Sequence, residues 1–337
     1  MSEFRRDPFT GHWRLFAEGR SARPNEYGGA PAGDAGVATC PFCEGRESST
    51  PPEFAAVRPT GGPPDGPGWV VRSFPNKFPT LEPVERPPDV ASDPFFERAV
   101  GAGRHEVIVM SPAHATPFSM LPPAQLRLLL RFFRDRVRAV GAVPNVRTMI
   151  LLENKGPESG GTLPHPHAQL LASAVIPDRV REESEAFAAG PAGCALERVL
   201  SHELGAGDRV VFQDDTWVAF APFASEHPFE LWVVPRRHAP SFAAANDAET
   251  EGLAKLLPAL LRALDALRPG ASYNWFAHGL AGSDESTDRF HWHLELTPRL
   301  QRADGFELAA GIPVNAVLPE RAAENYRRAL SDTGGKR

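Results

Sequence analysis

The spacing of apolar residues predicts two long amphipathic helices. Between residues 122 and 140, leucine, phenylalanine and valine recur every three or four positions, and paired prolines open the segment. A second helix is predicted over 247–267, where Pro258 is expected to introduce a kink. The arginines of the first segment fall between its apolar positions and are read as a solvated face. Each helix is therefore expected to bury one face against a core.

Short apolar runs predict strands over 69–74, 107–110, 146–152 and 166–171. A turn and a short strand are predicted within 4–27. The charged, alanine-rich stretch 177–193 marks a boundary between two parts of the chain. We place an N-terminal domain over 1–178 and a C-terminal domain over 190–330.

The second part repeats the order of motifs in the first. The paired features are Cys40/Cys43 with Cys194/Glu197, the runs ending at His114 and His238, the two helices, and the H-x-H pairs at 165–167 and 291–293. One unit of sheet plus helix, used twice, explains this order better than coincidence.

Composition narrows the class of protein. The formal net charge of −6 comes from interspersed acids and bases over 337 residues, so the basic stripe of a nucleic-acid binder is absent from the sequence. The apolar runs are too short to span a bilayer, and the polar start lacks the apolar segment of a signal peptide. Three cysteines cannot form a disulfide framework. We expect a cytoplasmic protein that binds neither nucleic acid nor membrane.

The strongest chemical signal is H-x-H-x-Q after a glycine-rich loop. If 166–171 is extended, His165, His167 and Gln169 point to one face of a strand. Such groups can bind a metal, attack phosphorus or donate to a phosphate oxygen. The alternative, two surface histidines on a strand, fits poorly because apolar residues flank the motif and buried imidazoles need partners.

Cys40-Pro41-Phe42-Cys43 is a second chemical signal. A C-x2-C pair in a cytosolic protein is half of a zinc site or a redox pair. A thioredoxin-like pair follows an apolar strand and opens a helix, whereas a glycine-rich loop precedes this one, so zinc is favoured. The remaining ligands would come from His114 and His165, with His105 as a competing choice.

Other polar residues are weaker candidates. Arg20 and Arg23 are close enough in sequence to hold one anion, although two solvated arginines explain them equally well. Asn76 lies in a predicted turn and can be conformational. The loop 156–161 has the glycines of a phosphate cradle, which alone is weak evidence.

Taken in order, these motifs resemble the galactose-1-phosphate uridylyltransferase branch of the histidine-triad superfamily. The resemblance rests on C-x2-C, Ser-Pro-x-His and H-x-H-x-Q together with supporting segments that span nearly the whole chain. These segments are 6–11, Arg20 with 23–24, 75–79, 153–156, 228–230 and 305–307.

The resemblance implies an α+β fold of two histidine-triad-like halves in tandem, with an antiparallel half-barrel sheet, packed helices and a homodimeric assembly. It implies that Zn²⁺ is held by four residues and that His167 is the nucleophile. The implied zinc ligands are Cys40, Cys43, His114 and His165. The implied substrate-binding residues are Gln169, Asn76, Asn154, Thr162, Arg20 and Arg23, with Phe306 and Glu307 reaching the partner subunit's site.

A second metal, zinc or iron, has two complete candidate ligand sets. The internal repeat predicts Cys194, Glu197, His238 and His291, with a glutamate in place of a thiolate. A different arrangement within the family maps to Glu183, His278, His291 and His293. His291 is common to both sets, and the sequence does not decide between them.

The resemblance implies transfer of UMP between UDP-glucose and a hexose 1-phosphate such as galactose 1-phosphate, by ping-pong exchange through uridylyl-His167. Gln169 favours transfer because histidine-triad hydrolases carry a third histidine there to protonate the leaving group, whereas a departing phosphate needs no proton. An ADP-glucose adenylyltransferase or phosphorylase of the same family is the alternative, and 305–315 resembles that branch. A nucleotide hydrolase and a non-catalytic nucleotide-binding protein are the remaining hypotheses.

Overall fold

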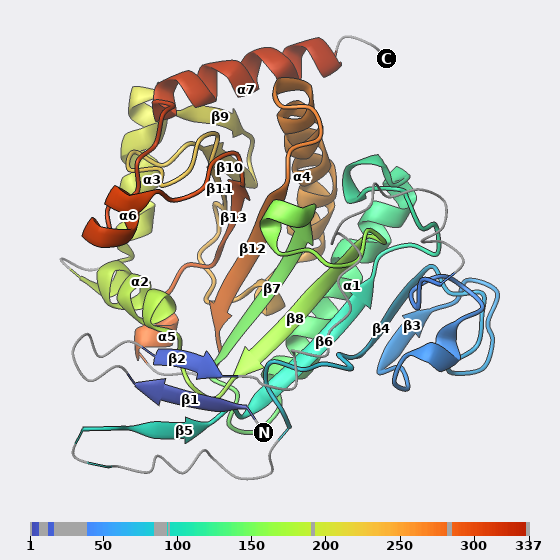
Figure 1. Cartoon of the computed structure of the whole chain (residues 1–337). Helices are drawn as coiled ribbons and strands as arrows, with labels where there is room; N and C mark the ends of the chain where they lie inside the picture. Colours follow the sequence, from blue (N-terminus) through green and yellow to red (C-terminus); the bar gives the residue numbers. More distant parts are fainter. Residues whose placement is uncertain are drawn as a thin grey trace.

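A computed structural model describes residues 2–6, 13–16, 39–83, 93, 95–189, 193–281 and 285–334. The fold is α+β, with one ten-stranded antiparallel sheet and helices packed on it (Figure 1). This confirms the predicted antiparallel sheet with packed helices. Arg20 and Arg23 lie outside the described residues.

The order of strands in the large sheet repeats the order of motifs in the sequence. Reading across the sheet, the strands are β3 (Ala55–Val57), β4 (Val71–Pro75), β6 (Gly103–Val109), β8 (His167–Ser173), β7 (Thr148–Lys155), β12 (Tyr273–Leu280), β13 (His293–Pro298), β11 (Leu231–Pro235), β10 (Trp217–Phe220) and β9 (Val210–Gln213). The first five come from one half of the chain, and the last five follow the same plan in mirrored order. The two halves therefore join where equivalent strands, β7 and β12, pair along eight residues.

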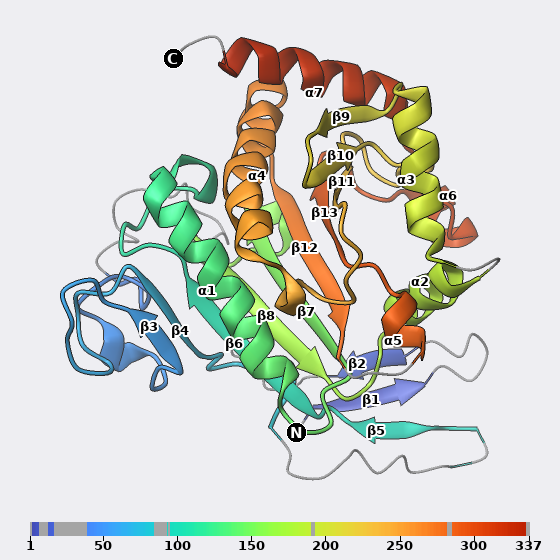
Figure 2. The same cartoon turned by 180° about the vertical axis from the view of Figure 1, so that it is seen from behind.

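Two long helices cover one face of this sheet, as the view from behind shows (Figure 2). They are α1 (Pro123–Gly141) and α4 (Asp247–Leu267), which match the predicted bounds closely. Helix α4 continues through Pro258, and Asn246 caps its first turn. The apolar faces of both helices and alternate residues of the strands, such as Ala168 and Leu170 of β8, form the main core. The other face of β8 is left to His167 and Gln169.

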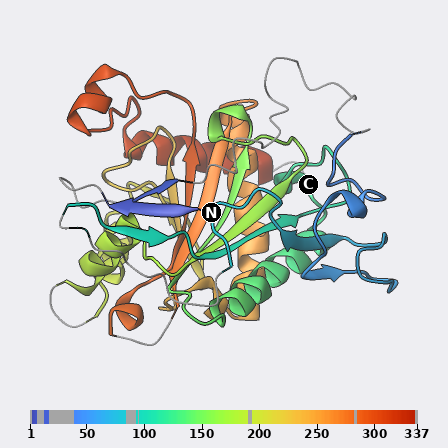
Figure 3. The same cartoon turned by 60° about the horizontal axis from the view of Figure 1, so that its bottom comes forward.

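Smaller elements cover the ends of the sheet. The three-stranded sheet β2 (Trp13–Phe16), β1 (Glu3–Arg6) and β5 (Arg98–Val100) lies below the large sheet in Figure 1, and Figure 3 brings this end forward. It packs on Leu171 and Val175 next to β8. The remaining helices are α2 (Asp178–Ala188), α3 (Ala195–Ala206), α5 (Glu285–Arg289), α6 (Gly305–Ala310) and α7 (Pro319–Gly334), with 3-10 turns at Glu47–Ser49, Phe118–Met120, Pro157–Ser159 and Phe242–Ala244. Within the described residues, every helix is too short or too polar to cross a membrane.

The predicted boundary 177–193 is largely helical. Helix α2 occupies Asp178–Ala188, and its partly buried Glu183 contacts His278 on β12. The charged composition that suggested a boundary is thus the outer face of a helix, whose Val180 and Phe187 are buried.

A buried carboxylate lies where the two halves join. Glu153 on β7 accepts hydrogen bonds from Trp275 Nε1 (2.6 Å) and the Tyr273 hydroxyl (3.3 Å), both on β12. Burial raises the pKa of Glu153 to about 7. The carboxyl group therefore keeps its proton in the folded state at pH values where it would ionise in the unfolded chain.

This raised pKa predicts a pH-dependent stability. The stabilising protonated form is retained below the unfolded pKa of 4.5 and is lost as pH rises through about 7. Between pH 5.5 and pH 8, Glu153 should cost the wild type about 2 kcal/mol of unfolding free energy. Glu153→Gln should remove most of this difference in urea unfolding at the two pH values. An unchanged difference in the variant would show that other groups cause it.

Candidate active site and metal centres

The His167 ring is oriented by the backbone carbonyl of His165. His167 begins β8, and its Nδ1 donates to the carbonyl oxygen of His165 (2.8 Å), so the lone pair resides on Nε2. The ring lies edge-on to Phe42, with centroids 5.1 Å apart. His167 lines a cavity of about 330 Å³ and is buried except for its face to that cavity. The imidazole thus faces a space large enough for part of a nucleotide.

Gln169 is held by His105, which the sequence analysis considered only as a competing choice of zinc ligand. His105 on β6 accepts a hydrogen bond from the Thr80 amide at Nδ1 (3.0 Å), so its Nε2 carries the proton. That nitrogen lies 2.9 Å from Gln169 Oε1 and donates to it. The Gln169 carbonyl is thereby turned away from the cavity, and its NH₂ group is left to donate to a ligand. His105 is a positioning residue for Gln169, and it is not grouped with the cysteines.

The predicted substrate-binding residues fall into three groups. Asn76 and Thr162 line the same cavity as His167 and Gln169. Asn154 lines a neighbouring cavity of about 190 Å³, where it accepts a hydrogen bond from Asn274 (2.7 Å). Phe306 is exposed on α6, and Glu307 caps that helix by accepting from the Asp304 amide. Phe306 and Glu307 line neither of these two cavities in this chain.

The first metal set comes together as predicted. The ligand atoms of Cys40, Cys43, His114 and His165 all lie within 4.8 Å of one another. Cys43 Sγ is 3.3 Å from His114 Nδ1, and the two sulfurs are 3.6 and 3.7 Å from His165 Nδ1. Ligands around a tetrahedral zinc ion are separated by about 3.5 Å, so these distances fit.

Ionisation of the cysteines in this set depends on a bound cation. Burial raises the pKa of Cys40 to about 12 and lowers the pKa of His165 to about 4. A buried thiolate is stable there only beside a positive ion, and His165 is neutral, as a ligand must be. His165 Nε2 donates to the Ser111 carbonyl (2.8 Å), which orients Nδ1 toward the cysteines. Zinc with four protein ligands would have no open position and would fix the start of β8.

The repeated set in the C-terminal half is similar. Cys194, His238 and His291 offer ligand atoms within 4.8 Å of one another. His291 Nε2 donates to the Pro235 carbonyl (2.9 Å), which corresponds to the bond from His165 to Ser111. Its Nδ1 is buried and has no hydrogen-bond partner among the described residues. Glu197 lies outside this trio but its Oε1 is 3.3 Å from His238 Nδ1, within reach of a bound ion.

The alternative set is assembled with a different fourth member. Glu183, His278 and His293 lie together, but the fourth group within 4.8 Å is Glu295 rather than His291. The two candidate sets therefore do not compete for His291 in the structure. Sequence comparison of the halves contained a signal for this, because Glu295 stands at the repeat position of Gln169.

Comparison with known proteins identifies the family of the chain. Residues 70–177 match the N-terminal domain of galactose-1-phosphate uridyl transferase, and 181–333 match its C-terminal domain. The chain belongs to this family. An ADP-glucose phosphorylase from Arabidopsis thaliana is 27% identical over 96% of this chain and 92% of its own length. Galactose-1-phosphate uridylyltransferase from Thermotoga maritima is 25% identical over 97% and 98%. A solved uridylyltransferase structure has a TM-score of 0.79 at 29% identity, covering 98% of this chain and 99% of that one.

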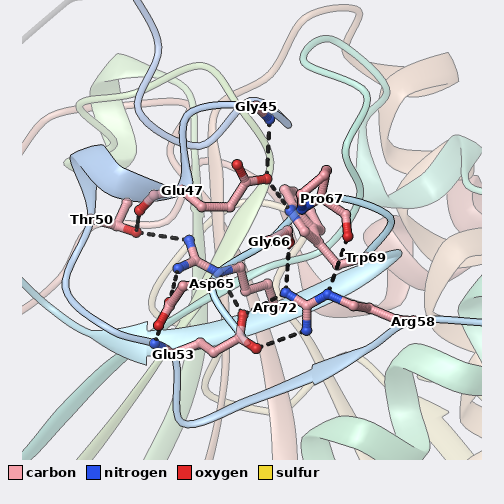
Figure 4. A network of polar contacts seen from close by, with 10 residues as sticks. All are labelled: Gly45, Glu47, Thr50, Glu53, Arg58, Asp65, Gly66, Pro67, Trp69 and Arg72. Atoms are coloured by element: carbon pink, nitrogen blue, oxygen red, sulfur yellow. Dashed lines mark hydrogen bonds and ion pairs between the residues drawn. The ribbon is translucent and has the colours of Figure 1, made fainter. Parts of the chain in front are cut away.

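In this member of the galactose-1-phosphate uridyl transferase family, a network of polar and charged residues surrounds Arg72 (Figure 4). Arg72 on β4 is 2% exposed. It donates to Thr50 Oγ1 (2.7 Å), Glu53 Oε2 (3.0 Å) and Asp65 Oδ1 (2.7 Å). Thr50 lines the cavity together with Ser49. No sequence motif marks Arg72, because its partners are brought to it by the fold.

The same network includes residues of the segment that follows Cys43, the second cysteine of the C-x2-C pair. Glu47 Oε1 accepts from Trp69 Nε1 (2.7 Å) and from the Gly45 amide (3.1 Å), and Arg58 makes two bonds to Glu53 (2.7 and 2.8 Å). The loop from Gly45 to β4 is therefore tied to the sheet edge by charge-assisted bonds, which are stronger than neutral ones. Arg58 and Arg72 each bond to three residues of this network, and Arg72 is the one that reaches Thr50 at the cavity.

Arg72→Met is expected to raise the KM for the nucleotide sugar about 10-fold with a smaller change in kcat. Removing the guanidinium leaves Glu53 with one partner fewer, which should lower the free energy of unfolding by about 3 kcal/mol. Thr50, which lines the cavity, also loses its hydrogen bond from Arg72 and becomes less well positioned. The measurement is steady-state kinetics at a temperature where both proteins are folded. Arg138→Met, at an exposed arginine of α1, is the control. Equal KM values for the two variants would contradict a role in positioning.

Proposed function

We propose that this protein transfers a nucleoside monophosphate from a nucleotide sugar to a phosphate-bearing acceptor through a covalent adduct on His167. The observation that carries the proposal is the pair His167 and Gln169: a neutral Nε2 facing a cavity, with an amide two residues on whose NH₂ is free to bind phosphate oxygens. We infer that the two halves are histidine-triad-like units and that the second has lost the reaction.

The reaction has two displacement steps at one phosphorus. In the first, His167 Nε2 forms a bond to the α-phosphorus of the nucleotide sugar, and the bond to the bridging oxygen breaks to release sugar 1-phosphate. In the second, a phosphate oxygen of the acceptor attacks the same phosphorus and the N–P bond breaks. The leaving groups are phosphates and imidazole, so neither step needs a proton donor as strong as a third histidine. Gln169, positioned by His105, would stabilise the negative charge at phosphorus.

The proposed donor is UDP-glucose, with a hexose 1-phosphate such as galactose 1-phosphate as acceptor. ADP-glucose, with phosphate as acceptor, is the second candidate. It is favoured by the similarity to ADP-glucose phosphorylase over 96% of this chain and by the run Gly305–Asn315. Both donors use the same chemistry at His167.

Intact-protein mass distinguishes the donors. The protein is incubated briefly with UDP-glucose or ADP-glucose, without acceptor, and quenched at alkaline pH because the N–P bond is labile in acid. A uridylyl increment supports the first candidate and an adenylyl increment the second. Absence of both adducts from the folded, zinc-loaded protein would overturn the covalent mechanism. Rapid release of free nucleotide without acceptor would instead indicate a hydrolase.

We propose a homodimer in which α6 reaches the partner subunit's site. Phe306, Leu308 and Ile312 expose large apolar side chains in and after α6, which contact with a partner would bury. Light scattering of the wild type and of Leu308→Glu tests this assembly: a monomeric wild type would overturn it.

A further inference from the structure

The C-terminal half contains a copy of the nucleophile position. His293 begins β13 as His167 begins β8, and its Nδ1 lies 3.2 Å from the carbonyl oxygen of His291, repeating the bond from His167 to His165. The copy is closed to substrate. His293 is 0% exposed, stacks on Trp232 at 4.3 Å between ring centroids, and contacts Phe187 of α2. The reactive nitrogen of this copy must therefore serve something that is not a nucleotide.

The atoms facing this nitrogen are suitable for holding a cation. Glu183, His278, His293 and Glu295 offer ligand atoms within 4.8 Å of one another. His293 Nε2 and Glu295 Oε1 are 3.7 Å apart, too far for a hydrogen bond, and neither has a hydrogen-bond partner among the described residues. Two buried polar atoms without partners are costly unless an ion lies between them.

Neighbouring groups orient these ligands. Glu295 Oε2 accepts from Arg179 Nη2 (2.6 Å), which leaves Oε1 directed at His293. Glu183 Oε1 lies 3.2 Å from Arg179 Nε, while its Oε2 is bonded to His278 Nε2. One arginine thus holds both carboxylates from outside, as the outer partners of metal ligands commonly do.

This cluster shares no residue with the thiolate cluster beside it. His291 Nδ1 faces Cys194 and His238, and His291 does not belong to the group around His293. The family arrangement with Glu183, His278, His291 and His293 would instead place one ion between the two clusters. In this chain Glu295 takes the place of His291, so each cluster keeps its own ligands.

We propose that the C-terminal half binds two ions at once. One is a zinc ion at Cys194, His238 and His291. The other is a divalent first-row metal ion, of the iron(II), manganese or zinc class, held without sulfur by Glu183, His278, His293 and Glu295. The second ion links α2 to β12 and β13 and occupies the position at which the first half binds substrate. With the Cys40 site, the chain would hold three ions.

Metal analysis of the purified full-length protein tests the stoichiometry. Mass spectrometry of the metals should find three equivalents per chain in the wild type, two in Glu295→Gln, two in Cys194→Ser and one in the double variant. Glu324→Gln, at an exposed glutamate of α7, is the matched control and should keep three. Two equivalents in the wild type, or a double variant that loses no more than either single variant, would overturn the proposal.

Cobalt substitution distinguishes the two sites within the folded wild type and does not depend on the variants folding. Protein stripped of metal is titrated with Co²⁺ while the absorption from sulfur-to-cobalt charge transfer is followed. Three equivalents should bind, and one of them should add no sulfur absorption. Saturation at two equivalents, both with sulfur absorption, would show that the Glu295 cluster is an ion-pair network without metal.

Discussion

His167→Asn is expected to lower kcat by at least about four orders of magnitude and to abolish the covalent adduct. Asparagine can still donate to the His165 carbonyl, so β8 should start in the same place. It offers no nucleophile, because an amide nitrogen does not attack phosphorus. The cavity around it is unchanged, so the dissociation constant for the nucleotide sugar should change only a few-fold. Calorimetric binding, exchange kinetics and intact mass measure the three quantities.

His202→Asn provides the matched control, since His202 is an exposed histidine on α3. It should behave as the wild type in all three measurements. If His167→Asn turned over at a tenth of the wild-type rate or more, the covalent route would be excluded, because among the described residues His167 supplies the imidazole that lines the cavity. Two other buried histidines lie nearby: His165 groups with the cysteines, and His105 contacts Thr80, Asn76 and Gln169.

Cys40→Ser is expected to remove one equivalent of zinc, lower the melting temperature by about 10 °C and reduce activity at least 10-fold. The physical reason is the position of His165, which would ligate the ion through Nδ1 while its backbone carbonyl accepts from His167. Without the ion, the buried imidazole loses its partner and the strand start is no longer fixed. Zinc content, thermal unfolding and kcat/KM test the three effects.

Cys194→Ser is the appropriate comparison because it also removes a thiol from a proposed metal site, but in the half without the nucleophile. Its zinc content should fall by one equivalent while kcat/KM stays within a few-fold of the wild type. A Cys40→Ser protein with full activity and no zinc at the first site would show that the ion does not hold the catalytic strand.

Apolar periodicity and short motifs predicted the features that depend on residues close together in the sequence. The bounds of α1 and α4 follow from apolar periodicity and capping, and the zinc set follows from C-x2-C with two histidines at strand ends. The role of His105 could not be predicted, because its partner Thr80 reaches it only once β6 and the loop after β4 are folded. Histidines that ligate and histidines that orient an amide look the same in sequence.

The locations of residues that depend on pairing between strands distant in the sequence could not be predicted either. Asn154 was predicted to bind substrate. It accepts a hydrogen bond from Asn274 on β12 and lines a second cavity rather than the cavity at His167. Glu295 joins a cluster because α2 brings Glu183 over β13. The charged composition of α2 suggested a boundary between halves, and the fold also uses this helix to cover histidines of the second half, with Glu183 beside His278.

The pairing of β7 with β12 has a consequence for dividing the chain. Each is a central strand of the ten-stranded sheet, and the pair joins the two halves over eight residues. Cutting the chain near residue 190 would give each fragment a long, hydrogen-bonding edge strand with apolar residues such as Leu151 and Trp275 beside it. Edges of that kind recruit other strands. Fragments expressed separately should therefore aggregate, or reassemble with each other when co-expressed, rather than persist as two soluble domains.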